Sequence, residues 1–255
     1  MRRKVFIVVI SAAVFGLAVS CYAQEEASKL GRFFYMGNDY YEKGEYLKAI
    51  DEYNKVITAG YESGALYYNL GNAYFRSGAL GKAILNYERA ERFILRDADL
   101  RANYRFARAK ISGKVLEKKG IWNWRPLRLY SENFTINELL WLTTGIYILV
   151  IILLTIAVQS PGIARRIFIV VLLFFLLGIW NSLIIWHKVR GIGRDAVVIL
   201  PQVESRYGPF DSATKFFKLY EGIKVRVLKD KADWDKIERA DGKVGWVKKG
   251  AIEII

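Results

Sequence analysis

Two long runs of uncharged, mostly apolar residues dominate the hydrophobic pattern of the chain. The first is Leu139–Val158 and the second is Ile167–Trp186, and neither contains Asp, Glu, Lys or Arg. A helix needs about 20 apolar residues to cross the roughly 30 Å hydrocarbon core of a bilayer. The pattern therefore predicts transmembrane helices at 139–158 and 167–187, joined by a tight loop at 159–166.

The polar residues inside these spans argue for an anchor. Transporters and channels usually hold ionisable side chains at mid-membrane, where such groups are costly and serve a function. Here the polar side chains are amides and hydroxyls, chiefly Thr143, Asn181 and Ser182. Groups of this kind commonly form hydrogen bonds between neighbouring helices. We therefore interpret the spans as a helical hairpin that anchors the chain.

The first 23 residues have the pattern of a signal sequence. A basic segment, Arg2–Lys4, precedes the apolar run Val5–Val19, and the small residue Ala23 follows shortly after. This order predicts cleavage after Ala23. Two alternatives stay open: the four residues that end at Cys21 can be interpreted as a lipobox with an acylated cysteine, or the segment can remain as an uncleaved anchor.

The signal sequence also predicts an orientation. With the N-terminus inside, residues 24–138 and 195–255 lie outside the cytoplasm, and the loop at 159–166 lies within it. An even number of spans places both soluble parts on the same face of the membrane. The expected location is the bacterial cytoplasmic (inner) membrane, crossed twice after signal cleavage.

An internal repeat with a period of 34 residues precedes the spans. The identical pairs at this offset are Gly37 and Gly71, Tyr40 and Tyr74, Gly44 and Gly78, Ala49 and Ala83, and Tyr53 and Tyr87. Small residues where two helices cross, large ones around them, and a glycine to end the first helix describe a helix-turn-helix unit. We predict repeats at about 30–63 and 64–97 and a capping helix at 97–117, within an all-α domain at 24–118.

The second repeat resembles the tetratricopeptide repeat. Tyr67–Tyr74 is similar to the first helix of that family and Lys82–Ala90 to the second, whereas Tyr61 and Leu95 stand at its terminal proline position. The resemblance implies a concave face that binds extended peptides, with asparagines that clamp a peptide backbone and an arginine that pairs with a carboxylate. The matching positions are Phe34, Asn38, Tyr41, Tyr68, Asn72, Phe75 and Arg76. Alternatively, these aromatic residues pack against the membrane-proximal segment or a second copy.

Aromatic and basic residues alternate just before the first span. The segment 119–138 carries Trp122, Trp124 and Tyr130 together with Arg125 and Arg128. Rings of this kind favour the membrane interface, and guanidinium groups favour the lipid phosphates. We expect an interfacial linker here.

After the second span the hydrophobic pattern shortens to that of strands. The short β-rich segments are Ala196–Leu200, Lys224–Leu228, Trp234–Glu238 and Val244–Val247. Turn signals separate them, and Asp241-Gly242 between two strands is a strong hairpin signal. Some 60 residues of short strands predict a small all-β barrel at 195–255.

This last part resembles the bacterial SH3 domain. The similar segments are Leu219–Val225, Asp233–Ile237 and Asp241–Val247. The resemblance implies that cell-wall peptides are a possible ligand, and that Tyr207, Tyr220 and Trp234 could line the groove. For Trp246 we favour a place in the core.

Composition narrows the function. The chain is 53% hydrophobic and 25% charged, so the two kinds of residue must be segregated along it. The net charge of +14 is spread over the segments, without the basic stripe of a nucleic-acid-binding protein. A single cysteine, and a single histidine at the end of an apolar run, allow no disulfide, no metal cluster and no histidine-based catalytic triad. We expect no enzymatic activity, no cofactor and no metal.

The order of these parts makes the chain multidomain and resembles the BatE-like family of the bacterial aerotolerance operon. The resemblance covers nearly the whole chain. It implies an adaptor in an envelope complex, with membrane proteins that carry von Willebrand A domains and a MoxR-type ATPase system as partners. The alternative is a sensor that binds peptidoglycan through the SH3-like domain.

Overall fold

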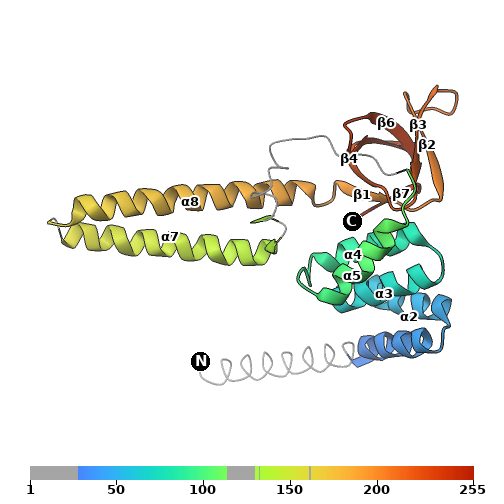
Figure 1. Ribbon diagram of the computed structural model, residues 1–255, viewed down its shortest axis with the longest axis horizontal. Helices are drawn as coiled ribbons and strands as arrows, with labels where there is room; N and C mark the ends of the chain where they lie inside the picture. Colours follow the sequence, from blue (N-terminus) through green and yellow to red (C-terminus); the bar gives the residue numbers. More distant parts are fainter. Residues whose placement is uncertain (1–27, 114–129, 132, 161) are drawn as a thin grey trace, which may run out of the picture.

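The computed structural model describes residues 28–113, 130–131, 133–160 and 162–255 (Figure 1). The predicted signal sequence at 1–23, with Cys21, lies outside the described residues. So does most of the predicted linker at 119–138.

Three parts follow one another along the chain. The repeat part holds a helix over residues 28–42 and the helices α2 (Tyr46–Thr58), α3 (Gly64–Arg76), α4 (Leu80–Glu91) and α5 (Ala98–Ala109). The hairpin consists of α7 (Ile136–Gln159) and α8 (Ala164–Gly191). The strands are β1 (Asp195–Val198), β2 (Gln202–Arg206), β3 (Lys215–Tyr220), β4 (Lys224–Lys231), β5 (Trp234–Arg239), β6 (Val244–Lys248) and β7 (Ile252–Ile254).

Within each repeat, a glycine on the first helix lies against a tyrosine ring on the second. A Cβ atom added at Gly37 would lie 2.5 Å from the ring of Tyr53, and one added at Gly71 would lie 2.8 Å from the ring of Tyr87. Both tyrosines are buried. No larger residue fits at either glycine without displacing a buried ring, so the 34-residue period reports a close crossing of two helices.

The helix α5 begins in the same way as α3, one period later. The side chain of Ser63 accepts a hydrogen bond from the Leu66 amide (3.2 Å), and that of Asp97 accepts one from the Leu100 amide (2.8 Å). Such N-caps satisfy amides that have no partner within the helix. The helix α5 therefore takes the place of the first helix of a third repeat, within the region expected to cap the stack.

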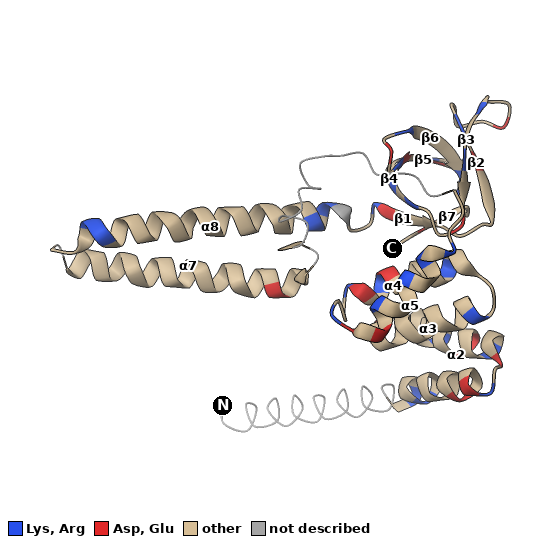
Figure 2. Cartoon of the chain, viewed as in Figure 1, with Lys and Arg blue, Asp and Glu red and all other residues tan. Residues whose placement is uncertain are grey.

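The two apolar helices lie side by side and antiparallel (Figure 1). Each is long and apolar enough to cross a membrane, with a mean hydropathy of 2.5 for α7 and 2.7 for α8. Figure 2 shows their charged residues confined to the ends. The Nδ2 of Asn181 on α8 donates to the Oγ1 of Thr143 on α7 (2.7 Å) and to the carbonyl of Leu139 (3.1 Å). This confirms the expected hydrogen bonds between the helices.

The C-terminal part is a seven-stranded antiparallel sheet. Its strand order is β3-β2-β6-β5-β4-β1-β7. The expected hairpin at Asp241-Gly242 connects β5 and β6, in which Glu238 pairs with Val244. The residues of β1 are buried on both faces, because Ala196 and Val198 enter the core of the sheet while Val197 joins the core of the repeats.

The repeats and the sheet share one apolar core. Val197 of β1 and the C-terminal Ile255 pack in the same cluster as Ile84 and Leu85 of α4 and Tyr104 of α5. The backbones come close at Gly81, where an added Cβ would lie 2.6 Å from the carbonyl oxygen of Val198. The amide of Gly81 also donates to a carboxylate oxygen of Glu221 (3.0 Å). The sheet thus covers the end of the repeat array.

Charged residues complete this interface. The Nζ of Lys224 on β4 lies 2.8 Å from the Oε2 of Glu88 on α4, and Arg89 pairs with Glu253 at 3.0 Å. Burial opposes ionisation of Glu88, but the Lys224 ammonium and the Tyr104 hydroxyl outweigh it and hold the pKa of this carboxyl below its usual range. Both ends of the Lys224–Glu88 pair are therefore charged at neutral pH.

Replacing Gly81 with Ala tests this interface. The added methyl group meets the backbone of Val198 and Ile199, and overpacking of this kind costs about 1–3 kcal/mol. We expect a lower melting temperature for the full chain in detergent. The control is Gly31→Ala, where the methyl group meets no atom within 4 Å and the helix gains about 0.5–1 kcal/mol. Equal melting temperatures for both variants would contradict the close approach at Gly81.

Candidate functional site

The predicted site residues lie on two neighbouring helices of the repeats. Phe34 on the first helix is half-buried, with its ring 5.9 Å from that of Tyr53. Tyr41, one turn before the end of that helix, contacts Tyr46 of α2 with 5.4 Å between ring centroids. Arg76 at the end of α3 donates from Nε to the Tyr46 hydroxyl (3.1 Å).

These contacts bring two predicted site residues to one place. Tyr41 and Arg76 meet around Tyr46, which the sequence reasoning did not single out. Burial raises the pKa of Tyr41, while the nearby Arg76 guanidinium opposes that rise. The Arg76 side chain itself is exposed, and within the described part of the chain it pairs with no carboxylate. A cation bonded to a tyrosine can still bind an acidic group.

A second aromatic and cationic cluster follows on the next helices. The ring of Phe75 on α3 packs edge-on against Phe106 on α5, with 5.7 Å between centroids. The Nζ of Lys110 lies 5.0 Å from the Phe106 ring and 5.9 Å from that of Phe75. Phe106 is 59% exposed. The site therefore extends onto α5, and the 34-residue offset from Asn72 to Phe106 was the signal that could have shown this.

The two predicted asparagines bind inside the repeats. The Oδ1 of Asn38 accepts from the Tyr53 hydroxyl (2.8 Å) and from Asn69 (2.9 Å). One period later, the Oδ1 of Asn72 accepts from the Tyr87 hydroxyl (2.7 Å) and from Asn103 (3.1 Å). All four positions recur at an offset of 34 residues.

This repeated hydrogen-bond network gives the asparagines a structural role. Each asparagine joins the two helices of its own repeat to the first helix of the next repeat. Asn103 also donates to the hydroxyl of Tyr68 (2.9 Å), which fixes that predicted site residue as well. Asn69 and Asn103 were missed because a pair one period apart carries no signal until the stacking direction is known.

The three residues predicted for the groove of the β part lie apart. Tyr207 follows β2, is 62% exposed and stacks on Phe216 at 4.2 Å. Tyr220 pairs with Gln202 at the other end of the β2–β3 hairpin, and its ring lies against Gly113 beyond α5. Five residues along β2 separate these two ends by about 16 Å.

The two tryptophans of the sheet differ from their expected places. Trp234, expected in a groove, is only 7% exposed and packs beneath the Nζ of Lys248 at 5.6 Å. Trp246, expected in the core, is half-buried, with Lys236 over its ring. The alternation of strand residues predicted neither, because the packing of this face also depends on the long side chains around it.

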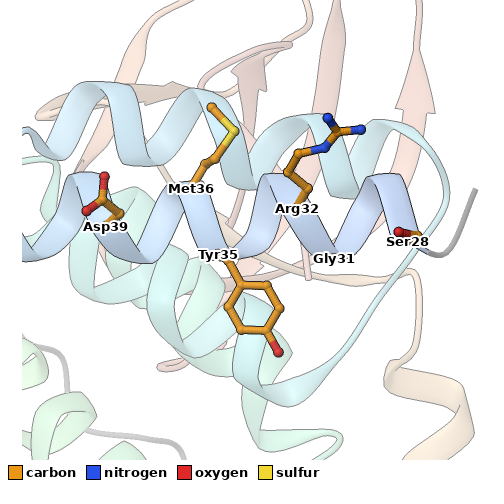
Figure 3. A pocket seen from close by; sticks show the side chains of 6 residues that line it. All are labelled: Ser28, Gly31, Arg32, Tyr35, Met36 and Asp39. Atoms are coloured by element: carbon orange, nitrogen blue, oxygen red, sulfur yellow. The ribbon is translucent and has the colours of Figure 1, made fainter.

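One shallow pocket lies on the outer face of the first helix. Figure 3 shows the residues that line it, which share one face of the helix: Ser28, Gly31, Arg32, Tyr35, Met36 and Asp39. One period later, the positions of Arg32 and Met36 are taken by Leu66 and Leu70, which are buried against α2. The pocket is therefore the open end of the array. The described residues contain no cluster of His, Cys, Asp or Glu that could hold a metal ion.

The network at Asn72 predicts an asymmetry between its members. Asn72→Ala leaves the buried hydroxyl of Tyr87 without its acceptor, which costs about 1–3 kcal/mol. Asn103→Ala removes an exposed donor whose partners can turn to water, so we expect a loss below about 1 kcal/mol. Thermal unfolding of the full chain in detergent measures both. Equal losses in the two variants would contradict the assigned role of Asn72.

The comparison with known proteins agrees with the geometry over part of the chain. Residues 37–78 match the family model described as TPR repeat, which covers α2, α3 and the end of the helix before them. No curated protein matches the chain. The repeat part is therefore similar to the tetratricopeptide repeat family, and TPR repeats indicate that this part of the protein binds other proteins.

Proposed function

We propose that the protein is a membrane-anchored adaptor of a bacterial envelope complex, in which the repeat groove binds a segment of a partner protein. The two long apolar helices would hold it in the cytoplasmic membrane, with both soluble parts on the outer face. The proposal includes no enzymatic activity. Family resemblance names the partners: a BatE-like role in aerotolerance, beside von Willebrand A domain proteins and a MoxR-type ATPase system.

The carrying observation is the surface formed by the first helices of the three repeats. Two aromatic clusters, at Tyr41 and Tyr46 and at Phe75 and Phe106, each lie beside an exposed cation. These cations are Arg76 and Lys110. Aromatic side chains and arginine are the residues that contribute most to protein–protein binding. An extended segment with apolar and acidic side chains fits such a surface.

A pair of exposed positions tests the groove without disturbing the asparagine network. Arg76→Glu with Phe106→Ser reverses one cation and removes one aromatic anchor, while the helices keep their buried contacts. We expect the specific partners to be lost from the material that co-purifies from membranes and is identified by mass spectrometry.

The matched control changes the same residue types at the open end of the array, as Arg32→Glu with Tyr35→Ser. We expect this variant to retain the partners. Recovery of the same partners by the Arg76→Glu, Phe106→Ser variant would contradict the groove assignment.

A second candidate function is binding of peptidoglycan by the β part, folded as an SH3-like barrel. The observation in its favour is an aromatic surface at the tip of the β2–β3 hairpin, where Tyr207 stacks on Phe216 and Phe210 is also exposed. The Nζ of Lys243 lies 5.9 Å from the Phe216 ring. Rings beside a cation suit a ligand with sugar faces and carboxylates.

Co-sedimentation with purified cell wall tests this candidate. The full chain in detergent is used, because an isolated β part would expose Val197 and Ile255, which pack on the repeats. We expect Tyr207→Ala with Phe210→Ala to reduce sedimentation and Leu228→Ala, an exposed position on β4, to leave it unchanged. Binding that is the same in all three proteins would contradict a site at this hairpin.

A further inference from the structure

The turn between α4 and α5 is fixed against the base of the hairpin. The Nη2 of Arg96 in this turn lies 2.8 Å from the Oε1 of Glu138 and donates to the carbonyl of Asn133 (3.2 Å). The Arg96 guanidinium also lies over the ring of Phe134, 5.6 Å from its centroid. Along the long axis of the molecule, this turn is the part of the repeats nearest the hairpin (Figure 1).

The partners of Arg96 lie where the hairpin would leave the hydrocarbon. Glu138 directly precedes the uncharged run that begins at Leu139. On the other helix, the Nζ of Lys188 donates to the carbonyls of Ser131 and Phe134, both at 2.6 Å. The Arg190 guanidinium covers the Trp186 ring at 3.9 Å. Tryptophan and cations at the end of an apolar helix are typical of the lipid headgroup layer.

The same turn exposes an aromatic ring. Phe93 is 46% exposed, and one face of its ring stacks on Tyr67 with 6.1 Å between centroids. It stands three residues before Arg96, so it lies within a few ångströms of the level that Glu138 marks. An exposed ring at this level would bury its edge among lipid headgroups, where aromatic side chains are enriched.

Other charged groups near the turn have partners within the protein. Asp97 caps α5, and Arg92 donates to the carbonyl of Ile255 (2.7 Å). Arg101 donates from Nε to the carbonyl of Leu95 at 3.0 Å. Acidic and basic residues alternate here, so the ring of Phe93 is the feature that singles out the bilayer interface as the occupant.

We propose that the α4–α5 turn, Phe93–Arg96, is a third membrane contact, in which Phe93 enters the phospholipid headgroup layer while Arg96 locks the turn to the start of α7. This inference rests on the proposed anchoring of the hairpin. It gives the repeat groove a fixed height and tilt above the membrane. A partner segment would therefore be bound at a set distance from the bilayer.

Site-specific fluorophores on the full chain in lipid nanodiscs test the proposal, in a Cys21→Ser background. Labels are placed at Phe93→Cys, at Ser77→Cys and at Ile151→Cys. Ser77 lies at the far end of α3, about 20 Å along the helix from its start. Lipids that carry a nitroxide quencher on the headgroup or on the acyl chain are the probes. We expect headgroup quenching at position 93, none at position 77 and acyl-chain quenching at position 151.

Each outcome has one meaning. A label at position 93 that is no more quenched than the one at position 77, while position 151 is quenched, would overturn the third contact and leave the anchor intact. Absence of quenching at position 151 would instead refute the anchoring. Arg96→Gln, added to Phe93→Cys, should reduce headgroup quenching at position 93 without changing position 151, because the turn loses its bonds to Glu138 and Asn133. Unchanged quenching at position 93 would overturn the role assigned to Arg96.

Discussion

The approach of strand β1 to helix α4 is the contact on which the rest of the structure depends. It requires a residue without a side chain at Gly81, since the carbonyl of Val198 occupies the space of a Cβ. Around it, Val197 and Ile255 complete the apolar core of the repeats, and Lys224 neutralises Glu88. Because β1 begins only a few residues after α8, this single contact joins the repeats, the sheet and the hairpin. A second connection, from Arg96 to Glu138, closes the structure at the base of the hairpin.

The features that the sequence predicted are those determined by local periodicity. The 34-residue offset indicated a glycine–tyrosine crossing in each repeat, and the uncharged runs indicated two long helices. The short segments near Lys224 and Trp234 indicated strands. In each case the pattern of residues a few positions apart is enough, because the elements bury one face or cross one slab of hydrocarbon.

The features that it did not predict depend on contacts between distant residues. Tyr220 was expected in a binding groove, yet its ring lies against Gly113 in the interface between sheet and repeats. Asn38 and Asn72 were expected to face a peptide, yet their oxygens accept hydrogen bonds from tyrosines of the same repeat. Gly81, the residue that admits the sheet, takes the place of Leu47 one period earlier, and nothing local distinguishes such a replacement from an ordinary surface change.

The account predicts that the repeats and the sheet move as one body above the membrane. A distance distribution between spin labels at Ser77→Cys and Lys229→Cys, in a Cys21→Ser background and in lipid nanodiscs, measures this most directly. Both positions are exposed, one beyond α3 and one on β4. The shared core predicts a single narrow distribution. A broad or multimodal distribution would contradict it, because the two parts would then move independently.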